Sequence, residues 1–265
     1  MTAGAAPATA DWIAPPVWPP PLRAGDVHVW RIGLTASAEE LSRLASLLTA
    51  DEHARAARFH FERDARPWTV ARAALRALLA GYTGAAPSAI ELETGPHGKP
   101  RLRGAARDVR FNLSHSGELA LCAIALGQEV GIDVEAVRAD RAGDDIARRF
   151  FAPAEVSALA ALPAAARVEA FFTCWTRKEA YVKARGAGLA LGLDRFEVSL
   201  APGAAAALLA THDEPAEAAR WQLGALDPGP GYAAALVVEG RAAVRCWQWP
   251  GVAAGAGGGE PGRAG

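Results

Sequence analysis

The stretch FFTCWTRKEAYVKARGAG (residues 171–188) predicts one long helix with an unusual face. Trp175, Glu179 and Lys183 follow one another at intervals of four residues, so their side chains lie along one side of a helix. Lys178 lies beside this row, and the glycines that close the stretch predict where the helix ends. A carboxylate flanked by an indole and two lysines is, taken alone, typical of a solvated ion-pair face. Its meaning therefore depends on what other segments place beside it.

A second informative stretch is GIDVE (residues 131–135). On a strand, Asp133 and Glu135 point to one face, about 6.5–7 Å apart along the chain, and Val134 points the other way, into the core. Two neighbouring carboxylates repel each other unless a cation lies between them. Their oxygens suit Mg²⁺, which completes its coordination shell with water and substrate phosphates. Taken alone, the pair is more typical of an edge strand with solvated acids, so both interpretations stay open.

Basic residues occur in three further segments. Lys99 lies in the loop HGKP next to Pro100, and His115 follows Ser114 in LSHSG at the end of a predicted strand. Arg55 lies on a predicted helix. Each residue alone is more typical of a surface charge or a turn. Together they could hold phosphate groups, since lysine provides a point charge and histidine a hydrogen-bond donor.

The composition is that of an ordinary globular protein, with 51% hydrophobic and 22% charged residues in 265, enough for one large domain or two small ones. The net charge of −1 gives no support for nucleic-acid or membrane binding. Cys122, Cys174 and Cys246 lie outside any CxxC pattern and are expected to be reduced thiols. With no signal-peptide pattern and no apolar run of about 18 residues, a soluble cytoplasmic protein is expected.

Several enzyme classes are disfavoured because their motifs do not occur. The chain has no GxSxG elbow, P-loop or GxGxxG fingerprint, which argues against serine hydrolases, P-loop ATPases and dinucleotide-dependent dehydrogenases. Its histidines form no HxxxH or HxH pair, so a transition-metal site is not expected.

Periodicity and turn signals divide the chain into four parts: a disordered leader (1–25), an N-terminal α+β half (26–130), a C-terminal α+β half (131–250) and a flexible glycine-rich tail (251–265). Strands are predicted at 26–34, 90–95, three times within 109–137, at 195–200 and three times within 221–249. Helices are predicted after a capping box at Ser37 and Glu40, from Asp51, from Trp68 to Ala80, and twice within 144–162 before the opening stretch.

One internal similarity accompanies this division. FNLSHSGELALCAIALG (111–127) and WQLGALDPGPGYAAALVVEG (221–240) share an aromatic residue followed by a polar residue and leucine, a turn, and an alanine-rich apolar strand that ends at glycine. A chance match and a true repeat both remain open at this point. A true repeat would mean two halves of similar design.

The ordered combination of GKP, FNLSHSG, GIDVE and WTRKEAYVKARGAGL, over about residues 50–195, resembles the Sfp-type 4′-phosphopantetheinyl transferases. The resemblance implies an α+β pseudo-dimer of two similar halves with the active site between them. It also implies a monomer, because the length fits the pseudo-dimeric members and not the short trimeric ones. The implied reaction transfers 4′-phosphopantetheine from coenzyme A to a serine of an apo acyl or peptidyl carrier protein. It is Mg²⁺-dependent and releases 3′,5′-ADP.

The resemblance also implies roles for individual residues. The implied metal ligands are Asp133, Glu135 and Glu179. The implied catalytic residues are Glu179 and Lys183, with Glu179, or a metal-bound water that it orients, as the base. The implied coenzyme A contacts are Arg55, Lys99, Pro100, Ser114, His115, Lys178 and Lys183, of which Lys183 meets the pyrophosphate.

Two positions depart from the family pattern. Glu52 stands where some members carry a lysine, and RPW (66–68) places a proline where relatives continue into the helix, so the third helix is expected to begin there. The main alternative function is a non-catalytic protein that binds coenzyme A or a carrier protein on the same fold. Another magnesium-dependent phosphotransferase or nucleotide hydrolase is a third possibility. The motifs do not identify the carrier proteins or their pathway.

Overall fold

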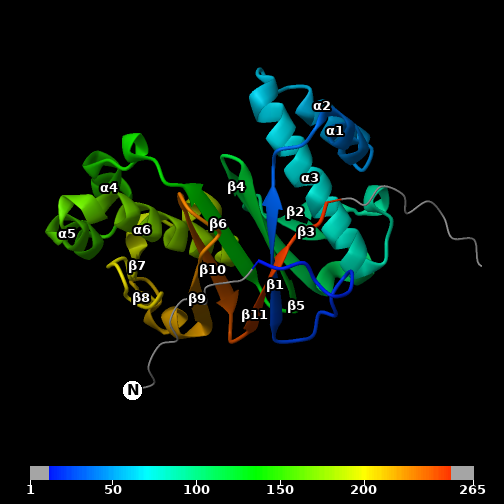
Figure 1. Cartoon of the computed structure of the whole chain (residues 1–265). Helices are drawn as coiled ribbons and strands as arrows, with labels where there is room; N and C mark the ends of the chain where they lie inside the picture. The colour runs from blue at the N-terminus through cyan, green and yellow to red at the C-terminus, as the bar shows by residue number, and fades with distance from the viewer. Residues whose placement is uncertain (1–11, 252–265) are drawn as a thin grey trace, which may run out of the picture.

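Of the four β-sheets in residues 12–251, the two larger stand side by side, each flanked by one long helix (Figure 1). The computed structural model describes residues 12–251. Its strands are β1 (Asp26–Gly33), β2 (Leu92–Thr94), β3 (Pro100–Leu102), β4 (Val109–Ser116), β5 (Leu119–Leu126), β6 (Val130–Ala136), β7 (Phe196–Val198), β8 (Leu208–Thr211), β9 (Trp221–Leu226), β10 (Tyr232–Glu239) and β11 (Ala243–Gln248). Its α-helices are α1 (Ala38–Ala45), α2 (Ala50–Ala56), α3 (Glu62–Thr83), α4 (Asp144–Phe150), α5 (Pro153–Ala161) and α6 (Ala164–Arg185).

The two halves repeat one topology. The first sheet contains β1–β5–β4 and the second β6–β10–β9, and every neighbouring pair within these two sets is antiparallel. In each half a strand is followed by helices, the last a 22-residue helix (α3 or α6), and later by a hairpin whose second strand pairs with the first strand. The hairpins β4–β5 and β9–β10 carry the internal sequence similarity, which is therefore a true repeat. The predicted α+β fold of two similar halves is confirmed.

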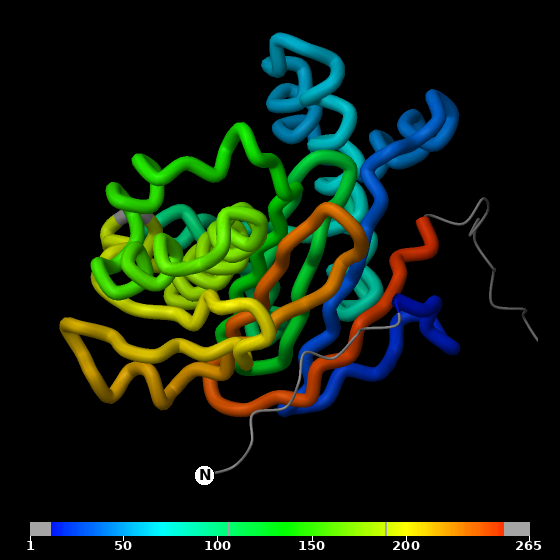
Figure 2. Tube along the Cα trace, turned by 60° about the vertical axis from the view of Figure 1, so that its left-hand side comes forward, coloured from blue at the N-terminus to red at the C-terminus, as the bar shows by residue number. Residues whose placement is uncertain are grey.

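The chain crosses between the halves once more at its end. β11 was expected in the C-terminal half (131–250), but it pairs in parallel with β1, in the sheet of the N-terminal half. Figure 2 shows this last strand lying along the first. The predicted boundary is thus wrong for β11, because pairing between strands more than 200 residues apart leaves no local signal in the sequence.

Part of the predicted leader (1–25) is packed against the body of the protein. Ile13 forms a β-bridge with Trp247, and the Trp12 indole donates a hydrogen bond of 2.6 Å to the carbonyl of Asp227. The Trp18 ring lies 5.1 Å from the Trp30 ring, edge to face. Residues 12–25 are therefore not disordered, whereas residues 1–11 and nearly all of the predicted tail lie outside the described residues.

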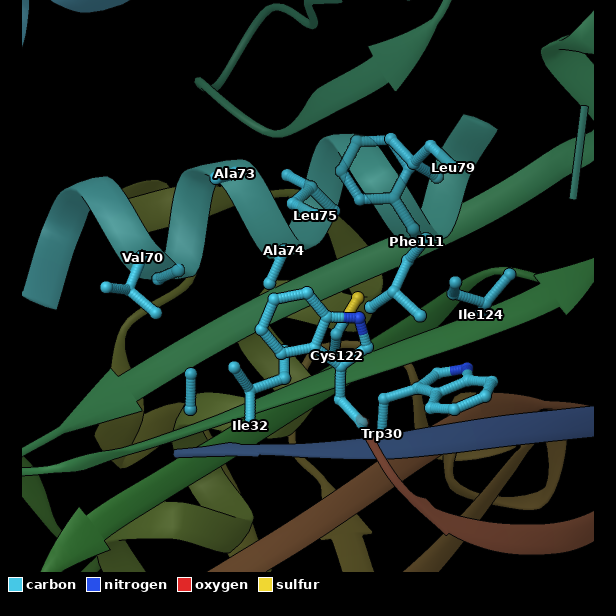
Figure 3. Packing of buried hydrophobic residues seen from close by; sticks show 14 of the residues in the cluster. Trp30, Ile32, Val70, Ala73, Ala74, Leu75, Leu79, Phe111, Cys122 and Ile124 are labelled. Atoms are coloured by element: carbon cyan, nitrogen blue, oxygen red, sulfur yellow. The ribbon is translucent and has the colours of Figure 1, made fainter. Parts of the chain in front are cut away.

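The N-terminal core forms where α3 lies across the sheet, as Figure 3 shows for Ala74 and Leu75 against Trp30 and Cys122. Alanines on this face allow the helix to approach the strands closely. α3 begins at Glu62, earlier than predicted, so that proline 67 falls inside its second turn. Proline has no backbone N–H, so the helix lacks one hydrogen bond at this position, yet it starts before the proline.

Other predicted features of the N-terminal half are confirmed or corrected at single residues. The capping box at the start of α1 is present, and a second one opens α2, where Thr49 and Glu52 cap each other. The α3 helix ends at Gly84, in a left-handed conformation, instead of near Gly81. Pro100, the last residue of the predicted loop HGKP, is instead the first residue of the short strand β3.

The halves meet where β4 faces β6. The Asn112 side chain accepts a hydrogen bond of 2.9 Å from the amide of Ile132, and the Ser116 hydroxyl accepts one of 3.1 Å from the amide of Ala136. Val134 is fully buried in an apolar cluster shared by both sheets, as predicted for the inward-facing residue of GIDVE. These contacts fix the register of β6 against β4, and with it the position of the acidic side chains between them.

Gly131 allows α6 to pack against β6. A Cβ at this position would lie 2.2 Å from the Ala180 carbonyl oxygen and 2.3 Å from the Ala184 amide nitrogen. Because these are backbone atoms of the helix, they cannot move aside by a rotamer change. Because Gly131 has no side chain, α6 can lie close to β6, and Glu179 and Lys183 then lie beside the carboxylates of β6.

Candidate active site

A cavity of about 420 Å³ opens between β4, β6 and α6. We call it the carboxylate cavity; it is lined by Leu113, Ser114, His115, Asp133, Glu135, Trp175, Glu179 and Lys183. The helical row from Trp175 to Lys183 and the acidic pair of β6 therefore face the same space, although they lie 40 or more residues apart in the sequence. Strand alternation and helical periodicity each predicted one wall of this cavity.

Asp133 is the most deeply buried of the three acids, with 2% of its surface exposed. Its Oδ1 accepts hydrogen bonds from Lys183 Nζ at 2.6 Å and Ser114 Oγ at 2.7 Å. Its Oδ2 is buried and has no partner among the described residues. Burial raises the pKa of Asp133 above its usual value, and the Lys183 charge and the two hydrogen bonds oppose the shift. An unpartnered buried carboxylate oxygen is a position at which a cation would be stabilised.

Glu135 and Glu179 complete the acidic wall. The Ser116 hydroxyl donates a hydrogen bond of 2.8 Å to Glu135 Oε2. Burial raises the pKa of both glutamates, and the negative charge of Asp133 raises each pKa further, whereas the Lys183 charge lowers them. The three carboxylates are therefore close enough to repel one another, and one lysine does not remove the repulsion.

The acidic wall has the donor set for a hard divalent cation. Three carboxylates and an orphaned Oδ2 suit Mg²⁺, which prefers oxygen ligands. As the side chains lie, no group of three or more His, Cys, Asp or Glu side chains in residues 12–251 is close enough to hold a metal ion. Glu135 is held by Ser116, and Asp133 Oδ1 by Lys183. The residues fit a cation, and binding it requires these side chains to converge.

His115 lies on the exposed rim of the same cavity. Partial desolvation of the ring, together with the Lys183 charge, lowers the pKa of His115. The imidazole is accordingly neutral at pH 7, with one nitrogen able to donate a hydrogen bond to a ligand and the other able to accept one.

A second cavity, of about 430 Å³, adjoins the first. We call it the glycine-lined cavity, because Gly98, Gly186, Gly188 and Gly192 contribute to its walls. The loop 97–100, the end of α4, the end of α6 and the loop 191–194 surround it, and Pro100 lies in this lining. Glu179 and Lys183 line both cavities and so form their common wall.

Lys99 lines the glycine-lined cavity, but its ammonium group is bonded to the protein. Nζ donates to Glu129 Oε2 at 2.7 Å and to the carbonyls of Val130 and Ala184, each at 3.0 Å. Burial lowers the pKa of Lys99, and the Glu129 carboxylate opposes this effect. All three ammonium protons have partners, so Lys99 joins the start of β6 to the end of α6. Gly186 is required beside it, since a Cβ there would lie 3.2 Å from Lys99 Cδ, and its φ is 61°.

Lys178, which the resemblance placed among the coenzyme A contacts, does not reach either cavity. Its side chain is fully buried, and Nζ lies 2.6 Å from Glu155 Oε2. Nζ also donates to the carbonyls of Leu193 at 2.7 Å and Phe196 at 2.6 Å. Because Leu193 lines the glycine-lined cavity, Lys178 acts on that cavity only through the loop that it holds.

The structure does not bring Arg55 to the site either. Arg55 lines neither cavity, and its guanidinium carbon lies 5.6 Å from the centre of the Trp68 ring. On the same helix, Glu52 is buried against Arg72 and Arg76 of α3. Glu52 therefore joins α2 to α3, which accounts for an acid at a position where some family members carry a lysine.

Several lining residues were not identified from the sequence. Arg149 and Phe150, at the end of α4, and the loop 191–194 belong to the glycine-lined cavity. For Arg149 and Phe150 the sequence offers one signal, the basic and aromatic pair RF at the end of α4, shortly before α6. The partners of the motif lysines, Glu129 and Glu155, had no signal at all, since they lie 30 and 23 residues away in the sequence.

Comparison with known proteins places this site in a family. A family model for the 4′-phosphopantetheinyl transferase superfamily matches residues 129–237, and one for the 4′-phosphopantetheinyl transferase N-terminal region matches residues 34–126. The 4′-phosphopantetheinyl transferase HetI of Nostoc sp. is 40% identical over 224 residues, which cover 83% of this chain and 90% of the relative. The 4′-phosphopantetheinyl transferase Sfp of Bacillus subtilis is 32% identical over 164 residues, which cover 62% of this chain and 71% of the relative.

The chain belongs to the 4′-phosphopantetheinyl transferase superfamily. The resemblance to the Sfp-type enzymes, inferred from four short motifs, is confirmed at the level of whole halves. Within residues 12–251, none of the helices has the length and apolar character needed to span a membrane.

Proposed function

We propose that this chain transfers the 4′-phosphopantetheine group of coenzyme A to a serine hydroxyl of an apo acyl or peptidyl carrier protein. Relatives named for this activity support the proposal. The observation that carries it is the common wall of the two cavities, where Glu179 and Lys183 face both. A donor held in one cavity and an acceptor entering the other would meet at these two side chains.

The glycine-lined cavity suits the nucleotide end of coenzyme A. Backbone-rich walls such as Gly186 and Gly188 allow a planar base and a ribose to approach closely. Pro100 and the aliphatic part of Lys99 contribute apolar surface to the same walls. Because the Lys99 ammonium is bonded to Glu129 and two carbonyls, Lys99 holds the cavity wall in place, and other cations contact the phosphates.

The pyrophosphate is assigned to the common wall. Lys183 Nζ uses two of its three protons on Asp133 and Ser114, which leaves one for a phosphate oxygen. Ser114 and neutral His115 supply further polar groups on the side of the carboxylate cavity. A fixed positive charge at this point stabilises the negative charge that grows on the leaving 3′,5′-ADP.

Asp133, Glu135 and Glu179 would hold Mg²⁺. When bound, the ion would neutralise phosphate oxygens and the repulsion among the three acids. Without a cation the three carboxylates would repel the pyrophosphate, so the ion would let both occupy one wall. The unpartnered Asp133 Oδ2 supports this assignment.

Glu179 is the proposed proton acceptor, directly or through a water that it orients. The serine oxygen forms a bond to the β-phosphorus of coenzyme A, the bond from that phosphorus to the 3′,5′-ADP oxygen breaks, and the serine proton goes to the base. Burial, the largest cause of the raised pKa of Glu179, favours proton uptake by this carboxylate. We also infer a monomer acting in the cytoplasm, since one chain supplies both cavities and its three cysteines are free thiols.

One mixture tests the proposal: the full chain, coenzyme A, Mg²⁺ and an apo carrier protein, with the carrier read by mass spectrometry. A gain of one phosphopantetheine on the serine is expected. Tight coenzyme A binding without transfer to any of a panel of acyl and peptidyl carriers would favour a non-catalytic binding protein. Breakdown of coenzyme A without a carrier would favour a nucleotide hydrolase.

Two variants test the assigned roles. Glu179→Gln should lower kcat by about 10²- to 10⁴-fold, the usual contribution of a general base, while the Kd for coenzyme A changes much less. Asp133→Ala should raise the Mg²⁺ concentration needed for half-maximal rate, with partial recovery at high Mg²⁺. Turnover of Glu179→Gln near the wild-type rate, or an Asp133→Ala rate that ignores Mg²⁺ concentration, contradicts the respective role.

A further inference from the structure

Glu129 lies in the turn between β5 and β6, where the chain passes from one half to the other, and it lines neither the carboxylate cavity nor the glycine-lined cavity. Three cations surround its carboxylate. Lys99 Nζ lies 2.7 Å from Oε2, and Arg101 Nη2 and Arg110 Nε lie 3.2 Å and 3.6 Å from Oε1. Because these cations belong to the loop 97–100, to β3 and to β4, one carboxylate links three segments of the N-terminal half to the start of β6.

The negative charge of Glu129 holds these cations together. Burial opposes ionisation of Glu129, but the hydrogen bond from Lys99 and the three positive charges lower its pKa. Burial also lowers the pKa of Lys99, and the Arg101 and Arg110 charges lower it further, whereas Glu129 raises it. Within residues 12–251, no other acid forms an ion pair with any of the three cations. A neutral side chain at position 129 would therefore leave three mutually repelling cations at one point.

Lys99 is the member of this group whose position affects the glycine-lined cavity. A Cβ at position 186 would lie 3.2 Å from Lys99 Cδ, and one at position 188 would lie 3.1 Å from the His97 carbonyl oxygen. The loop 97–100 is thus packed closely against the two glycines that follow α6, and both segments line the cavity. A shift of Lys99 would change the distance between these two walls.

We propose that Glu129 is a positioning residue for coenzyme A binding: it holds Lys99, and through Lys99 the loop 97–100, at the separation from α6 that admits the ligand. The inference rests on the proposed function. Glu129 acts on the wall of the cavity and does not touch the ligand. The reacting groups are supported separately, since Lys183 is held by two hydrogen bonds within the carboxylate cavity. Loss of the Glu129 charge should therefore weaken coenzyme A binding and leave the chemical step nearly unchanged.

Three variants separate the charge of Glu129 from its shape. Glu129→Gln keeps the shape and one acceptor oxygen but removes the charge, and Glu129→Asp keeps the charge on a side chain one methylene shorter. Glu93→Gln is the matched control, because Glu93 is an exposed glutamate of the neighbouring strand β2, pairs with Arg103 at 3.5 Å and lines neither cavity. The change in net charge alone would strengthen the binding of an anion in both glutamine variants, which is opposite in sign to the effect proposed for Glu129.

The experiment combines isothermal titration with coenzyme A and steady-state kinetics of the full-length chain, using an apo carrier protein that the wild type modifies. Glu129→Gln should raise the Kd and the KM for coenzyme A by about tenfold, as for loss of a hydrogen bond to a charged group, and change kcat by less than about threefold. Glu129→Asp should raise both constants less. Glu93→Gln should leave them within about twofold of wild type, because its ion pair is exposed. Circular dichroism should show all three variants folded.

A double-mutant cycle with Lys99→Met tests whether Glu129 acts through Lys99. If it does, Glu129→Gln should add less than about twofold to the Kd of Lys99→Met. Multiplied effects would show an independent role for Glu129, and an unchanged Kd in Glu129→Gln would show none. Either result overturns the proposal, as would a loss confined to kcat. A wild-type chain that does not bind coenzyme A would refute the proposed function and the inference together, whereas the variants test the inference alone.

Discussion

Lys178→Met should destabilise the protein strongly, although Lys178 belongs to the motif that identifies the family. The lysine is fully buried and its Nζ has three oxygen partners, on α5 and on the segment from Leu193 to Phe196. Methionine has a similar volume, so the change removes a charge and leaves little cavity. It strands the Glu155 carboxylate, which still accepts hydrogen bonds from the amides of Ala152 and Val198.

The expected loss is about 3–5 kcal/mol, the range for removing one partner of a buried ion pair. With a urea m-value of about 2–3 kcal/mol/M for a chain of this size, the unfolding midpoint should fall by roughly 1–2 M. Two unsatisfied carbonyls, Leu193 and Phe196, add to the cost in the folded state. The Leu193 segment should also loosen, so coenzyme A should bind more weakly to the folded variant.

Urea unfolding followed by circular dichroism measures the effect. Arg148→Ala is the control, because it breaks an exposed ion pair with Asp145 and should cost only about 0–1 kcal/mol. Lys178→Met combined with Glu155→Gln should recover part of the loss, since the glutamine carries no buried charge. A Lys178→Met loss no larger than that of Arg148→Ala would refute the assignment of Lys178 as a buried structural cation.

Two further outcomes follow from the packing and charges of the site. Gly131→Ala should cost more than about 3 kcal/mol in urea unfolding, because its Cβ would lie 2.2 Å from the Ala180 carbonyl oxygen; Gly33→Ala, whose Cβ would meet nothing within 4 Å, is the control. Glu179→Gln should raise Tm at pH 7–8 by about 2–4 °C per kcal/mol gained. The pKa of Glu179 is raised in the folded state, so its ionisation costs stability as pH rises above 4.5, and the advantage of glutamine should disappear below that pH. An advantage that persists below pH 4.5 would contradict this origin.

The sequence predicts elements where local patterning suffices. The capping box at Ser37, the strand at β1 and the left-handed Gly186 at the end of α6 are all predicted from local features, and each is present. The position of β11 beside β1 is not local, because it depends on which free sheet edge the last strand meets. The early start of α3 was missed for a related reason, since Glu62–Trp68 is stabilised by contacts outside the segment, such as Arg66 with the Ala36 carbonyl.

The same distinction holds for the site. Side-chain period alone places Asp133 with Glu135, and Glu179 with Lys183, which gives one wall each. That the two walls face one cavity was implied only by the family resemblance. The difference between Lys178 and Lys183 could not be predicted, because both flank Glu179 on one helix. Glu155 on a separate helix decides that Lys178 is buried, and Asp133 on β6 decides that Lys183 lines the cavity.

The packing that assembles the site also holds mutually repelling carboxylates close together. Gly131 lets α6 approach β6, and this approach brings Glu179 near enough to Asp133 for the Asp133 charge to oppose ionisation of Glu179. Selection for stability alone would favour one cation for each buried acid, the arrangement seen where Lys178 pairs with Glu155. Instead, one lysine serves three acids, and Asp133 Oδ2 stays unpartnered. A divalent cation that enters with a pyrophosphate relieves this repulsion, so it should bind the folded chain and raise its Tm, and Asp133→Asn should reduce that rise.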